Sequence, residues 1–115
     1  MTMVEQSLQR YKKNREAENA EEIEALVRQL ETRCEKLARQ GQLDEAVLFG
    51  SVLTPENFHG NSDLDIALGG VPSEETWGVV SELARGIGRE FDVQFLEDMP
   101  ERWVENIREE GIQLR

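Results

Sequence analysis

Two segments of this 115-residue chain alternate between large apolar side chains and side chains that, apart from one alanine, are polar. The apolar positions are Leu64, Ile66 and Leu68 in the first segment and Phe91, Val93 and Phe95 in the second; the others are Asp63, Asp65, Ala67, Asp92 and Gln94. Because successive side chains of a strand point to opposite faces, both segments predict strands with one apolar and one acidic face. A sheet of such strands is buried on one face only, so we expect helices to cover that face alone.

The remaining pattern predicts a small α/β (α+β) fold whose mixed sheet has three to four strands. An apolar run at residues 46–49 ends at Gly50 and indicates another strand. A short apolar tail at residues 112–114 indicates an edge strand. The predicted order is helix, strand, strand, helix, strand, helix, followed by this tail.

Two helices are predicted in the C-terminal half of the chain. The first follows Pro72, with Ser73 as its N-cap, and the second begins at Pro100. We expect Trp77 and Trp103 to fill the core from these helices. Exposure of Trp103 as a docking residue is the alternative.

The first 40 residues contain neither Gly nor Pro and predict a long amphipathic helix that ends near Gly41. Its apolar positions recur at steps of three and four: Ile23, Leu26, Val27, Leu30, Cys34 and Leu37. This stripe is broader than a coiled-coil seam, which favours packing on the helix's own domain over oligomerisation through the helix. We therefore divide the chain into an N-terminal helix, residues 1–41, and a domain, residues 42–115.

Charge restricts the partners of the chain. Thirteen Lys and Arg against 24 Asp and Glu give a net charge of −11, which disfavours direct binding of nucleic acid. Between Arg39 and Arg85 there is no Lys or Arg, so an anionic ligand of that stretch needs cations or backbone N–H groups. The N-terminus has no apolar run of the kind found in signal peptides or membrane spans, and we expect a cytoplasmic protein.

Three carboxylates are candidates for a metal site. Asp63 and Asp65 are two residues apart on one predicted strand, so both project from the same face, and Asp92 lies on the polar face of the next strand. Oxygen ligands of this kind suit Mg²⁺ or Mn²⁺, with nucleotide phosphates at the open positions. The alternative is a solvated polar sheet face without a ligand.

A Gly-Ser pair strengthens the metal-site interpretation. Gly50 and Ser51 directly follow an apolar strand, where backbone N–H groups and a hydroxyl can hold phosphates. The stretch LFGSVLTPENFHGNSDLDIAL, together with Asp92-Val93 and a helix ending at Gly111, resembles the minimal nucleotidyltransferase (MNT) family of the polymerase-β-like superfamily. The resemblance covers about residues 43–114.

The resemblance implies a role for each candidate residue. Gly50 and Ser51 would contact the phosphates of an NTP, and Asp63 and Asp65 would ligate Mg²⁺. Asp92 would be the third carboxylate and would position or deprotonate the acceptor hydroxyl. The family's loop carries a basic residue shortly after the Ser, whereas this chain has Val52-Leu53-Thr54. Arg85 and Arg89 are the candidate replacements.

The resemblance also implies a function. Many members of the family are antitoxins encoded beside HEPN-domain toxins, and some add AMP to a tyrosine of the partner. We therefore expect transfer of an NMP, AMP from ATP, to a hydroxyl of a protein partner. The alternatives are a non-catalytic antitoxin that neutralises its partner by contact, and transfer to a small molecule such as an antibiotic. His59, in the loop before the carboxylates, is interpreted as a solvated residue rather than a nucleotide ligand.

Overall fold

The computed structural model describes residues 2–14, 20–53 and 62–115. Its strands form one four-stranded sheet in the order β3-β2-β1-β4, with bounds β1 Glu45–Phe49, β2 Leu64–Gly69, β3 Phe91–Phe95 and β4 Ile112–Gln113. β1 pairs antiparallel with β2 and with β4, whereas β2 and β3 are parallel. The predicted mixed sheet and the C-terminal edge strand are confirmed.

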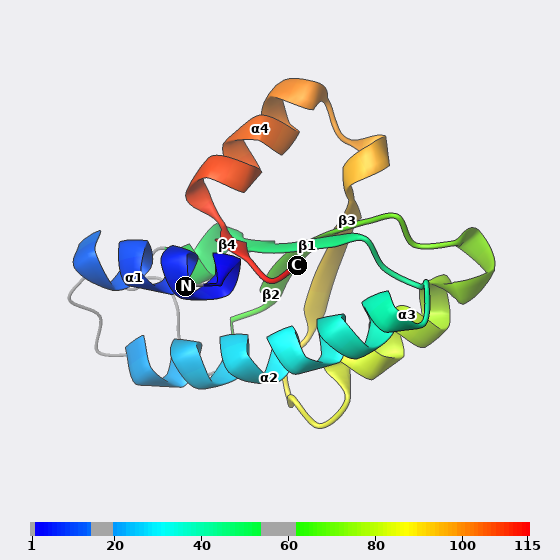
Figure 1. Cartoon of the computed structure of the whole chain (residues 1–115), viewed down its shortest axis with the longest axis horizontal. Coiled ribbons are helices and arrows are strands. Elements are labelled where there is room, and N and C mark those ends of the chain that lie inside the picture. The colour runs from blue at the N-terminus through cyan, green and yellow to red at the C-terminus, as the bar shows by residue number, and fades with distance from the viewer. Residues whose placement is uncertain (1, 15–19, 54–61) are drawn as a thin grey trace.

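Within the described ranges, four helices pack around this sheet (Figure 1): α1 Met3–Asn14, α2 Ala20–Arg39, α3 Thr76–Ala84 and α4 Glu101–Glu110. The described residues also form three short 3₁₀ segments between the larger elements: η1 Gly50–Leu53, η3 Ser73–Glu75 and η4 Leu96–Asp98. The sequence predicted one long helix over residues 1–41, and the described part of that segment forms two, α1 and α2. No helix of the described ranges has the length and apolarity needed to cross a membrane.

The core lies between α1, α2 and α3 and the apolar face of the sheet. Five positions of the α2 stripe are buried: Ile23, Val27, Leu30, Cys34 and Leu37. They pack in one cluster with the apolar face of β1 and β2, which confirms that the stripe serves its own domain. Burial raises the pKa of the Cys34 thiol to about 12, so this thiol stays protonated and unreactive at neutral pH.

Helix α4 lies against the opposite face of the sheet (Figure 1). Val104 packs there with Ala67 and Leu96. The prediction that helices cover one face only is therefore right for α1, α2 and α3 and wrong for α4. Ala67 is the reason, because this small apolar residue interrupts the polar face of β2 and leaves room for a helix.

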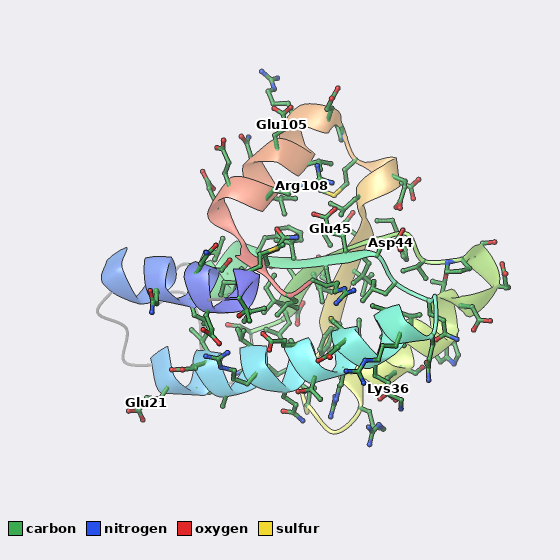
Figure 2. The ribbon with its side chains drawn as sticks, in the orientation of Figure 1. Glu21, Lys36, Asp44, Glu45, Glu105 and Arg108 are labelled. Atoms are coloured by element: carbon green, nitrogen blue, oxygen red, sulfur yellow. The ribbon has the colours of Figure 1, made fainter. Side chains whose placement is uncertain are left out.

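An ion pair fastens α4 to the start of β1. Arg108 donates to both carboxylate oxygens of Glu45, from Nε at 2.8 Å and from Nη2 at 2.7 Å. Figure 2 shows the two side chains reaching toward each other across the gap between helix and strand. The hydrogen bonds from Arg108 lower the pKa of Glu45, and one from Gln113 lowers it further against the effect of partial burial.

Some side chains of the two C-terminal helices lie elsewhere than predicted. Trp77 is 82% exposed and Trp103 is 61% exposed, so neither fills the core. Helix α3 buries Val79 and Leu83 instead, which turns Trp77 toward solvent. Ser73 does not cap a helix, and its hydroxyl donates a hydrogen bond to Glu74 Oε2.

We predict that Ile66→Ala lowers the free energy of unfolding by about 3 kcal/mol, because it leaves a cavity between β2 and the helices. Urea denaturation followed by circular dichroism measures this loss. Trp77→Ala is the control, and its exposed position predicts a change within about 0.5 kcal/mol. A cost for Ile66→Ala no larger than that of the control would contradict the described core.

We predict that Arg108→Met destabilises the protein by about 1 kcal/mol at pH 7, a value limited by the partial exposure of both partners. Because folding lowers the pKa of Glu45, the ion pair stabilises the folded protein above the unfolded pKa of this residue. The stabilisation is lost as the pH falls through the lowered folded value. The difference between wild type and variant, measured by urea denaturation, should therefore shrink toward pH 3. A difference that is constant from pH 7 to pH 3 would rule out the ion pair as its source.

Candidate functional site

The turn after β1 lies directly over a carboxylate. Phe49, the last residue of β1, is paired in register with Asp65 of β2, and the chain then enters η1 through Gly50. Gly50 has a φ of +75°, and a Cβ at this position would overlap the carboxylate of Asp65. Both the left-handed conformation and the close approach require glycine here. At the Gly-Ser pair the chain thus turns over the polar face of β2.

The sheet places the three predicted carboxylates close to one another. Asp65 of β2 is in register with Asp92 of the parallel strand β3, so the two lie side by side on the polar face. Asp63 precedes β2 by one residue and influences the charge on Asp65. Asp65 is half-buried, whereas Asp63 and Asp92 are exposed. The arrangement is a half-buried carboxylate flanked by two solvent-facing ones.

Two opposed effects act on the Asp65 carboxyl. Partial burial raises its pKa, and so do the negative charges of Asp92 and Asp63 and a hydrogen bond with Asp92. A hydrogen bond from the backbone N–H of Ser51 acts in the opposite direction. The net effect raises the pKa of Asp65. Burial is the largest cause of this rise, and the neighbouring carboxylates add to it.

Side-chain contacts fix the surroundings of the carboxylates. The Ser51 hydroxyl donates to the carbonyl oxygen of Asp63 at 3.3 Å, which ties the turn to the start of β2. Gln94 Nε2 donates to Asp92 Oδ1 at 3.3 Å. Gln94 was not predicted as a site residue, although its place two positions after Asp92 on the same face was visible in the alternation.

The potential metal ligands of the site are carboxylate oxygens. The described ranges contain no group of three or more His, Cys, Asp or Glu side chains already arranged to hold a metal ion. The pairing of Asp65 with Asp92 offers two carboxylates, and Asp63 is near enough to raise the pKa of Asp65. Carboxylate oxygens under mutual repulsion are suitable ligands for Mg²⁺ or Mn²⁺. The chemistry of the site fits such an ion, with nucleotide phosphates or water needed to complete its coordination.

The two arginines considered as replacements for the missing basic residue have other partners. Arg89 is 7% exposed and donates to the carbonyl oxygen of Ser62 at 3.0 Å and to Glu22 at 2.7 Å. It thereby fastens the residue before Asp63 to helix α2. Arg85 pairs with Glu82 on the outside of α3. Arg89 thus stabilises the backbone next to Asp63. His59 lies outside the described residues.

Comparisons with known proteins find similarities to a family and to a solved structure. The family model described as "Polymerase beta, Nucleotidyltransferase" matches residues 31–115, from the second half of α2 to the end of the chain. A solved structure described as "Crystal structure of the toxin-antitoxin with AMP-PNP" has a TM-score of 0.54 and 27% identity, and the similarity covers 74% of this chain and 72% of that one. The search of curated proteins gives no match. The division between residues 41 and 42 stays a prediction.

We predict that Gly50→Ala destabilises the protein by at least about 1 kcal/mol, because the added methyl group meets Asp65 in a backbone conformation unfavourable for alanine. Thermal unfolding measures the effect. Gly78→Ala is the matched control. It lies inside α3 with open space around it, so the same substitution should raise stability by about 0.5–1 kcal/mol. Equal effects of the two substitutions would show that Gly50 is not held over Asp65.

Proposed function

Because the chain belongs to the polymerase beta nucleotidyltransferase family, we propose that it transfers a nucleoside monophosphate, AMP from ATP, to a hydroxyl group of a partner protein. The observation that carries this proposal is the Gly50–Ser51 turn hydrogen-bonded to Asp65 beside Asp92. It combines a turn that carries a serine hydroxyl with neighbouring carboxylates. Such a pair of features suits a nucleotide bound together with divalent cations.

In this proposal Asp63, Asp65 and Asp92 hold Mg²⁺ or Mn²⁺, and Gly50 and Ser51 contact the triphosphate. The bound cation supplies positive charge that offsets the phosphates, which matters here because no Lys or Arg lies between residues 39 and 85. The Ser51 hydroxyl makes a long bond of 3.3 Å in the structure, so its exchange for a phosphate oxygen costs little. The backbone N–H of Ser51 keeps Asp65 oriented.

Asp92 is the residue best placed to accept the proton of the incoming hydroxyl. It is exposed at the edge strand of the sheet, next to Asp65, and Gln94 fixes one of its oxygens. The acceptor oxygen forms a bond to the α-phosphorus, and the bond from this phosphorus to the bridging oxygen breaks. Pyrophosphate leaves and the hydroxyl proton passes to Asp92.

The similar toxin–antitoxin structure and the charge of the chain support a protein acceptor. We propose that the chain is an antitoxin whose partner is a toxin of the HEPN type, modified in the cytoplasm. A net charge of −11 accelerates association with a basic protein and opposes a polynucleotide acceptor. No second domain is needed to present a protein hydroxyl to the exposed Asp92.

One observation favours a second function, neutralisation of the partner by contact alone. The loop residue that is basic in the family is absent, and Arg85 and Arg89 are bound to other groups. A site without a protein cation gives less stabilisation to the developing charge on the phosphates. In this alternative the carboxylates would not contribute to neutralisation.

We predict that wild-type protein with Mg²⁺ and ATP labelled on the α-phosphate labels one protein in a lysate of its host. The double variant Asp63→Asn/Asp65→Asn should lose at least about 100-fold of this labelling, because it removes two of the three carboxylates. Autoradiography of the separated proteins measures the transfer. Asp98→Asn is the matched control, since Asp98 is an exposed carboxylate on η4, away from the site, and its removal should leave labelling unchanged.

Neutralisation of the toxin by the same variants distinguishes the two functions. If Asp63→Asn/Asp65→Asn is folded and neutralises the toxin as well as wild type, the transferase proposal fails and the contact mechanism is supported. Deletion of residues 1–40 is unsuitable for this purpose, because α2 forms one wall of the core.

A further inference from the structure

An exposed tryptophan lies on α4, the helix that covers part of the polar face of the sheet. Trp103 of α4 is 61% exposed, although Val104 beside it is buried against the polar face of the sheet. The nucleotide-binding residues proposed so far contact only phosphates and cations. They leave the base of the nucleotide without a partner.

The orientation of α4 places Trp103 on the side of the helix nearer to the site. With 3.6 residues per turn, Arg108 lies about 40° to one side of Val104, and Trp103 about 100° to the other. Arg108 points to Glu45, the first residue of β1 (Figure 2). The side of α4 opposite to Arg108 therefore faces the last residues of β1, where the chain enters the turn at Gly50.

Apolar contacts support this orientation. Ile107, one turn after Trp103 on the same side of α4, packs against the small cluster of Ala67, Leu96 and Val104, and so does Phe49. Phe49 is paired in register with Asp65 and is followed by Gly50. Phe49 and Ile107 thus share one apolar cluster, which adjoins Gly50 along the chain and lies one helical turn from Trp103.

We infer that Trp103 is the platform on which the base of the bound nucleotide stacks, with Phe49 and Ile107 forming the apolar path from the phosphate site. This inference rests on the proposed function. The base is planar, uncharged and partly apolar, and it suits an exposed indole better than it suits the acidic surface of the remaining α4. Stacking tolerates any base, so Trp103 contributes affinity for nucleotides in general.

Fluorescence tests the inference, because the chain has only two tryptophans. Trp77→Phe leaves Trp103 as the single reporter, and Trp103→Phe leaves Trp77. With Mg²⁺ present, AMP-PNP should quench the fluorescence of Trp77→Phe in a saturable manner, and tripolyphosphate, which lacks a base, should not. Trp103→Phe should show no quenching by either ligand.

Calorimetry with the same ligands measures the contribution to affinity. Trp103→Ala should weaken AMP-PNP binding by at least about fivefold and leave tripolyphosphate binding unchanged, and Trp103→Phe should fall between wild type and Trp103→Ala. If AMP-PNP binds Trp103→Ala as tightly as wild type, the inference is overturned and the proposed function stands. If that variant also fails to neutralise the toxin, Trp103 belongs to a protein interface instead. If neither ligand binds wild type, both the proposed function and the inference fail.

Discussion

The register between β2 and β3 brings Asp65 beside Asp92, and the candidate site depends on this contact between two like charges. The register is imposed from the opposite face, where the apolar residues of both strands pack against α2 and α3. A shift by one residue would turn these apolar side chains to solvent and the carboxylates into the core. The core thus holds the two carboxylates side by side, and the proximity of Asp92 adds to the effect of burial in raising the pKa of Asp65.

The turn after β1 lies over Asp65, and helix α4, which follows β3, covers a neighbouring part of the polar face. Gly50 closes over Asp65 in a conformation that other residues adopt only with strain, and Ser51 directs its N–H at the same carboxylate. Helix α4 is anchored at the far end of β1 by the Glu45–Arg108 ion pair and covers Ala67. The polar face is consequently divided into a covered half at the start of β1 and an open half at its end, where the carboxylates lie.

The strands and the carboxylate cluster could be predicted from the sequence because a strand has a strict two-residue period, which assigned Asp65 and Asp92 to one face. Helix placement was harder to predict. The apolar residues of α4 fit either face of the sheet, and contact with Ala67 decides between them. In α3 apolar residues occur all around the helix, so only packing shows that Val79 is buried and Trp77 exposed. The role of Arg89 depends on contacts with residues far away in the sequence, which no local pattern reveals.

Anomalous diffraction from Mn²⁺ in crystals grown with Mn²⁺ and AMP-PNP tests the central claim most directly. The claim is that the carboxylates of β2 and β3 and the turn after β1 form one site for a nucleotide with its cations. We expect an anomalous peak at Asp65 and Asp92, with the phosphates against Gly50 and Ser51. A nucleotide bound elsewhere on the protein, or Mn²⁺ absent from these carboxylates at saturating concentrations of both ligands, would contradict the account.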